Sequence, residues 1–237
     1  MKKLLLLCLL TFSFSLAQEC ASLLEGTQPS VDLTSIEQSI TSATYVQGQT
    51  VNATIYQVVD LASKQLYQET TLPGMGEVIM RYQDGQATMQ LKGNDMNLPV
   101  PPQFSQQLEA VFDNAFGQAM LPAAYELVSC DGQQSYADLV TGEQVTINAT
   151  MPEALGGDMT SSLLFDADGQ MLGTYMTLPQ MGETLIVYDV FEQDEAGVPT
   201  QIDISMYTLG GAEPTLFSET QITTLSYNQP FEQPTGQ

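Results

Sequence analysis

A seven-residue stretch that occurs twice constrains the fold of this chain most. The sequence Thr-Leu-Pro-Gly-Met-Gly-Glu occupies 71–77, and a copy with Gln at its centre begins 106 residues later, at 177–183. Proline fixes φ and lacks an N–H, whereas glycine tolerates a positive φ, so both residues are typical of turns between strands. At the same offset Asp60 corresponds to Asp166, Leu66 to Leu172 and Tyr82 to Tyr188. We therefore predict a duplicated strand-turn-strand unit in one large curved sheet; two unrelated turns are the alternative.

The first residues have the pattern of a secretory signal peptide. Lys2 and Lys3 precede an apolar run, and Ser15-Leu16-Ala17 has small residues where cleavage requires them. No later stretch approaches the roughly 18 consecutive apolar residues of a membrane span. We expect an exported protein, periplasmic or secreted from a bacterial cell, that is monomeric and does not span the membrane. The expected organisation is a signal peptide at 1–17, a polar leader at 18–30, a single domain at 31–231 and a flexible tail at 232–237.

The chain is strongly acidic and poor in cysteine. It has 28 Asp and Glu against five Lys and Arg, a formal net charge of −23. Such a charge repels nucleic acid and anionic membrane surfaces, so we expect no nucleic-acid partner. Two cysteines, Cys20 and Cys130, follow the predicted cleavage site. An even pair in an exported chain is more often a disulfide than a reactive site, so we predict a Cys20–Cys130 disulfide.

Two segments have the apolar periodicity of helices. In the first, Asp32 to Ala43, Leu33, Ile36 and Ile40 recur at helical spacing, and Thr34 with Glu37 matches a capping box. The second, Gln103 to Gln118, gathers its phenylalanines on one side. This stripe is either core or a lid over a groove.

Most of the remaining chain alternates apolar and polar residues with a period of two. Turn dipeptides separate these runs, among them Asp84-Gly85, Asp131-Gly132 and Thr141-Gly142. We therefore predict a mainly β (α+β) fold. It would be a large curved antiparallel sheet or an unclosed β-barrel, with about ten strands and two helices covering the concave side.

The composition excludes several kinds of catalytic site. Histidine and tryptophan are both absent, which removes the commonest general base and the commonest transition-metal ligand. Asp166-Ala167-Asp168-Gly169 is similar to the start of a calcium loop, but Thr177 stands where the loop requires a glutamate, so a hairpin turn explains it better. We expect no catalytic residues, no metal and no cofactor. A hydrolase using paired carboxylates is a weaker alternative.

The layout of residues 31–231 resembles the LolA/LppX/RseB-like lipoprotein-carrier superfamily. The resemblance is strongest over Leu163–Tyr227 and the ending Tyr227-Asn228-Gln229-Pro230-Phe231. It implies an unclosed β-barrel whose interior holds the acyl chains of a lipid or lipoprotein. We expect no catalysis, and an envelope protein as a further partner. The resemblance also implies Arg81 as a polar contact to the ligand.

The repeat predicts which side chains face the interior. Met80 and Tyr82 alternate with Arg81, and at the repeat offset they correspond to Ile186 and Tyr188, so Leu185 and Val187 should lie on the other face. A methionine-rich lining suits a cavity that accepts flexible chains, although a packed core is the alternative. We predict an exported carrier of a lipid or acylated protein; an envelope interaction module without a small ligand is the second hypothesis. The predicted cavity lining is Met80, Tyr82, Met89, Leu91, Phe112, Ile147, Ile186, Tyr188, Ile202, Ile204 and Met206.

Overall fold

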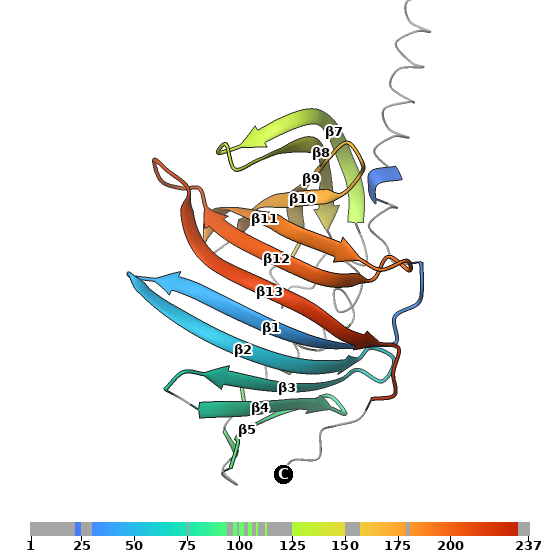
Figure 1. Ribbon diagram of the computed structural model, residues 1–237, viewed down its shortest axis with the longest axis vertical. Helices are drawn as coiled ribbons and strands as arrows, with labels where there is room; N and C mark the ends of the chain where they lie inside the picture. Colours follow the sequence, from blue (N-terminus) through green and yellow to red (C-terminus); the bar gives the residue numbers. More distant parts are fainter. Residues whose placement is uncertain are drawn as a thin grey trace, which may run out of the picture.

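A single antiparallel sheet of 13 strands dominates the computed structural model (Figure 1). The structure describes residues 22–24, 30–74, 76–93, 97–98, 100–101, 104–105, 108, 112, 125–149, 157–178 and 181–231. The strands are β1 (Ser35–Val46), β2 (Gln49–Asp60), β3 (Gln65–Leu72), β4 (Gly76–Gln83), β5 (Gln86–Leu91), β6 (Asn97–Leu98), β7 (Tyr125–Tyr136), β8 (Val140–Ala149), β9 (Met159–Phe165), β10 (Met171–Leu178), β11 (Gly182–Gln193), β12 (Pro199–Thr208) and β13 (Thr215–Tyr227). The predicted curved antiparallel sheet is thus confirmed, with more strands than expected.

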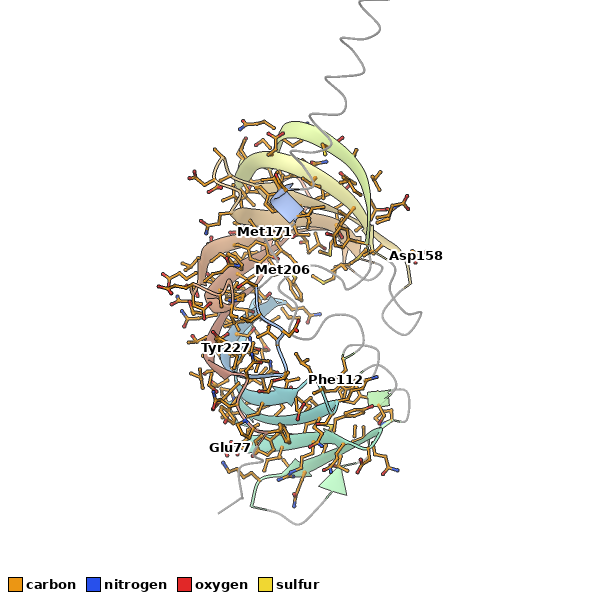
Figure 2. The ribbon with its side chains drawn as sticks, turned by 90° about the vertical axis from the view of Figure 1, so that its right-hand side faces the viewer. Glu77, Phe112, Asp158, Met171, Met206 and Tyr227 are labelled. Atoms are coloured by element: carbon orange, nitrogen blue, oxygen red, sulfur yellow. The ribbon has the colours of Figure 1, made fainter. Side chains whose placement is uncertain are left out.

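The chain starts in the middle of this sheet and reaches both of its edges. Strands β1 to β6 follow one another outward to one edge. Strand β7 forms the opposite edge, and β8 to β13 return to the middle, where β13 pairs with β1. The β6 and β7 edges are not joined in the described sheet, which is therefore open. The strands bend around one concave side (Figure 2).

The first predicted helix is wrong, because this segment forms β1 in the centre of the sheet. Ile36 and Ile40 are four residues apart, a spacing that places two side chains on one face of a strand as well as of a helix. Backbone pairing with β2 and β13 on both sides decides between the two conformations. The expected capping box does not form: the Thr34 N–H donates to Asn228 Oδ1 at 2.7 Å, and Glu37 accepts from the Tyr56 and Ser226 hydroxyls.

Two predicted turns in the β7–β8 region are also wrong. Asp131 and Gly132 lie within β7 at a β-bulge, and Thr141-Gly142 lies within β8. The Asp131 carboxylate accepts hydrogen bonds from Ser129, Gln144 and Thr146 side chains, so it is satisfied within the strand pair. The chain reverses instead at 137–139, between β7 and β8.

The repeated stretch forms two matching hairpins, as predicted. Thr70 lies between Ile55 on β2 and Val78 on β4. At the same offset Met176 lies between Ser161 on β9 and Thr184 on β11. Both turns close on a glycine with positive φ, 89° at Gly76 and 75° at Gly182. The duplication therefore extends over three strands and preserves their register.

The buried apolar side chains form three clusters on the two faces of the sheet. The β1–β4 cluster contains Ile36, Val59, Leu66, Met80 and Tyr82 with Leu108 and Phe112. The β8–β10 cluster contains Leu24, Val145, Ile147, Leu163, Phe165 and Met171. The third, Val140, Leu164 and Leu185, lies on the opposite face from these two.

Candidate ligand-binding face

The strand register places the predicted lining residues on one face of the sheet. Directly paired residues of antiparallel strands have their side chains on the same face, and alternate residues of a strand share a face. Tyr188 pairs with Ile204, Ile204 pairs with Thr220, and the pairs continue through β1 to β5. Ile147 joins the same face through Ser161 and Met176. All ten predicted residues on strands thus share this face.

This common face is the concave one. Phe112, from the connection between β6 and β7, lies on the concave side and Glu77 on the outer side (Figure 2). The Phe112 ring stacks on Tyr82 with centroids 5.4 Å apart. Leu108 and Phe112 are each 9% exposed, so these helical residues are core contacts at the β1–β4 end. The rest of the predicted second helix, apart from Phe104 and Ser105, lies outside the described residues.

The predicted residues are spread along the concave face rather than gathered in one pocket. Met80, Tyr82 and Phe112 belong to the β1–β4 cluster, and Met89 packs against it. Ile147 belongs to the β8–β10 cluster, and Tyr188 packs against it. Between the clusters, Ile202 is buried, whereas Ile186, Ile204 and Met206 are half-buried. Leu91, on β5 near the β6 edge of the sheet, is also half-buried.

A row of isoleucines crosses the sheet between these two clusters. Ile55 pairs with Ile40, Ile40 with Ile222, and Ile222 with Ile202; we call these four residues the isoleucine row. Phe191 pairs with Ile202 and extends the row to β11. Ile40, Ile55 and Ile222 are only half-buried. The predicted lining omits these three residues, and Ile40 falls in the segment predicted as a helix, where no period-two alternation indicates a strand.

Charged side chains are separated from this apolar surface. In the described parts of β1–β5 and β9–β13, every charged residue belongs to the convex face by register, or at Asp189 by its bond to Ser205. Glu143 on β8, paired with Phe165, is on the concave side. The convex residues are Glu37, Asp60, Glu69, Glu77, Arg81, Glu183, Asp189, Glu192, Asp203 and Glu219. A chain of net charge −23 thus presents a largely uncharged concave face.

Tyr188, on this face, also stays neutral. Burial raises the pKa of Tyr188, and a hydrogen bond with Thr174 opposes that shift without reversing it. A raised phenol pKa keeps the hydroxyl protonated throughout the physiological range. The concave face therefore offers neutral hydroxyl and apolar groups to a ligand.

Arg81 does not join the predicted lining. It pairs with Tyr67 on the convex face, and its guanidinium carbon lies 5.3 Å from the centre of the Tyr67 ring. Lys92 is nearby in sequence and forms ion pairs with Glu69 at 2.5 Å and Glu77 at 2.8 Å. Arg81 and Lys92 therefore have partners on the convex side, away from Met80 and Tyr82, and neither is available to a ligand on the concave face.

Two open grooves flank the strands. One, of about 520 Å³, lies beside the β9–β10 turn and is lined by Leu23, Met171 and Phe191 with polar residues of the turn. It joins the end of the isoleucine row to the β8–β10 cluster. The other, of about 470 Å³, is lined by residues of β1, β2 and β11–β13, including Asp189, Asp203 and Glu219. Its acidic lining makes it unsuitable for an acyl chain.

The aspartate of the loop that is similar to a calcium site, and a second turn aspartate, have structural partners. Asp166 Oδ1 accepts from the N–H groups of Asp168 and Gln170 at 2.9 and 2.8 Å, which is the geometry of a hairpin turn. Asp194 Oδ1 does the same for Ala196 and Val198. No group of three His, Cys, Asp or Glu side chains that could hold a metal occurs among the described residues. Within the same residues, no helix has the length and apolar character to cross a membrane.

Of the two cysteines in the predicted disulfide, only Cys130 is among the described residues. Cys130 is half-buried and packs against the β8–β10 cluster. Cys20 lies outside the described residues, as do the predicted signal peptide and the C-terminal tail. The disulfide and the domain boundaries stay predictions.

Several solved structures are similar to this one. The lipoprotein LppX of Mycobacterium tuberculosis is 14% identical, with a TM-score of 0.37, covering 92% of this chain and 97% of that one. A LolA superfamily protein of Nitrosomonas europaea is 9% identical, with a TM-score of 0.49 and coverages of 88% and 92%. A DUF1329 family protein of Desulfovibrio piger is 10% identical, with a TM-score of 0.46 and coverages of 94% and 94%.

No family model matches the chain, and no curated protein matches it. The solved structures include LppX and LolA-type proteins, the group that the sequence resembles. At these identities and TM-scores we base the function on the chain's own residues.

Proposed function

We propose that this protein is an exported, non-catalytic carrier that binds a lipid or the acyl chain of a lipoprotein on its concave face. The observation that supports this most is the separation of charge: the ten charged residues named above lie on the convex face, and half-buried isoleucines lie on the other. An apolar surface that is neither fully packed nor charged is typical of a binding site for an apolar ligand.

The dimensions of the isoleucine row suit a long acyl chain. Neighbouring strands are about 4.8 Å apart, so a path from β2 across β1, β13 and β12 to β11 is roughly 19 Å long. Each methylene group that leaves water contributes about 0.8 kcal/mol, so a chain lying along this path would gain affinity from burial alone. Half-buried Met206, on the same face of β12 four residues from Ile202, can adapt to chains of different shape.

Native mass spectrometry of protein purified from a bacterial periplasm tests the proposal. We expect adducts with the mass of a lipid, which disappear after extraction with organic solvent and return when lipid is added. A protein that never carries an adduct and takes up none from lipid vesicles would refute the carrier function.

The second hypothesis is an envelope interaction module, and the exposed edge of the sheet favours it. Strand β7 ends the sheet, and its residues Tyr125 and Val128 are 36% and 52% exposed. An edge strand can pair with an extended segment of another protein. Such a module would carry no lipid, so the same mass measurement distinguishes the two functions.

A further inference from the structure

A row of glutamines interrupts the apolar concave face next to the isoleucine row. Gln38, Gln57 and Gln68 lie on β1, β2 and β3 and are paired with one another across the strands; we call them the glutamine row. On one side the row is bordered by Ile40 and Ile55, and on the other by the β1–β4 cluster. Three amides in register thus lie on a mainly apolar part of the face, with Thr70 and Thr224 as their polar neighbours.

The glutamine row is built as a hydrogen-bonding site. Gln57 is 7% exposed, and its Nε2 donates to Gln38 Oε1 at 2.8 Å. Gln68 Nε2 donates to Thr70 Oγ1 at 3.0 Å. An amide side chain has two N–H donors and a carbonyl acceptor. Three such groups thus have more capacity than these two bonds use.

Packing does not require amides at these positions. Burying a polar group costs free energy unless its hydrogen bonds are satisfied, and a leucine or isoleucine would pack at least as well beside Ile55. A few polar groups placed in an apolar site usually fix the orientation of a ligand and select its polar end. On β1 and β2 the glutamine row lies two residues from the isoleucine row, about 6.7 Å away.

We propose that the glutamine row binds the uncharged polar end of the ligand, an ester or amide group next to a long acyl chain. The isoleucine row then holds the chain itself. This inference rests on the proposed carrier function and adds a ligand class to it. A carboxylate or phosphate in the same place would lose its hydration, and the described strands β1–β5 and β9–β13 bring no cation to the concave face.

Binding of three ligands with the same oleoyl chain tests this selectivity. Monooleoylglycerol offers a neutral ester, an N-oleoylated peptide amide offers a neutral amide, and oleate offers an anion. We expect delipidated full-length protein at pH 8 to bind at least one neutral ligand about tenfold more tightly than oleate, the effect of one or two hydrogen bonds. The better neutral ligand identifies the source as a lipid or an acylated protein.

Variants assign the preference to the glutamine row. Gln57→Leu should reduce the ratio between neutral ligand and oleate to about one while oleate still binds, because the apolar surface remains. Gln221→Leu is the matched control, since Gln221 is exposed on the convex face and donates to Asp203 at 3.1 Å. If Gln57→Leu does not fold, half-buried Gln38→Leu makes the same test.

The outcomes separate this inference from the carrier function. Unchanged selectivity in both glutamine-row variants would overturn the inference. So would equal binding of all three ligands to the unmodified protein, although that result would support the carrier function. Failure of every oleoyl compound to bind would refute both.

Discussion

Ile222 and Thr223 are neighbours in β13 whose side chains lie on opposite faces of the sheet. Ile222 pairs with Ile40 and Ile202, whereas Thr223 pairs with Ser39 and Gln201. Both are half-buried. They form a matched pair for testing which face binds a ligand, because a charge at either position changes the same strand.

We predict that Ile222→Lys still folds but loses bound lipid, because a half-exposed position tolerates a charge that an acyl chain does not. Thr223→Lys should fold and keep its lipid. For both variants, mass spectrometry measures the bound lipid, and the melting temperature measures whether the protein is folded. Equal lipid content in the two proteins would count against the concave site.

Asp194 provides a prediction about pH. Its carboxylate accepts from the Tyr227 hydroxyl at 2.8 Å and from two backbone N–H groups. The Tyr227 bond, followed by the Val198 N–H, lowers the pKa of Asp194 below its usual value. A depressed carboxyl pKa contributes stability above the unfolded pKa of about 3.9, and that stability is lost as the pH falls through the folded pKa.

We therefore expect Asp194→Asn to be less stable than the unmodified protein at pH 6 and no less stable at pH 2. Urea unfolding midpoints across this range measure the difference. Tyr227→Phe should show a smaller difference of the same sign. If the midpoints of Asp194→Asn and the unmodified protein differ by the same amount at every pH, the charge of Asp194 contributes nothing to stability.

At the scale of the element, the repeat was the most informative part of the sequence. It predicted two hairpins with one register, and through Met80 and Tyr82 it oriented β11, which is apolar on both sides. The helix predicted at 32–43 failed because an interval of four residues suits both helix and strand. The strand conformation of this segment depends on backbone pairing with β13, which is distant in sequence. The glutamine and isoleucine rows could not be predicted, since they exist only once five strands (β1, β2, β3, β12 and β13) are aligned.

The repeat also predicts the cost of changing its closing glycines. Gly76 and Gly182 have φ of 89° and 75°, a region that side chains other than glycine avoid. We expect Gly76→Ala and Gly182→Ala each to lower the free energy of unfolding by about 1–2 kcal/mol. Gly210→Ala is the control, because Gly210 is exposed with no atom within 4 Å of an added Cβ. Chemical unfolding of the three variants measures these free energies. A similar decrease in all three would contradict the role of positive φ at Gly76 and Gly182.

At the scale of the molecule, pairing of β1 with β13 joins the two halves of the sheet, and a disulfide would add a covalent link. The Cys20–Cys130 bond would close a loop of about 110 residues and contribute roughly 4–5 kcal/mol in the chain-entropy model. We expect peptide mapping of exported protein without reduction to find these cysteines joined. Two alkylatable thiols in protein from an oxidising compartment would contradict the prediction.

The central claim is that the concave face is where the ligand lies, and photo-crosslinking tests it most directly. Delipidated full-length protein is loaded with monooleoylglycerol carrying a diazirine in its acyl chain and then irradiated. Crosslinked residues are assigned by fragmentation. We expect labels that excess unlabelled lipid prevents, on concave positions such as Ile40, Ile55, Ile204 and Ile222. Labels concentrated on convex positions such as Thr41, Thr54 and Gln221, or spread equally over both faces, would contradict the account.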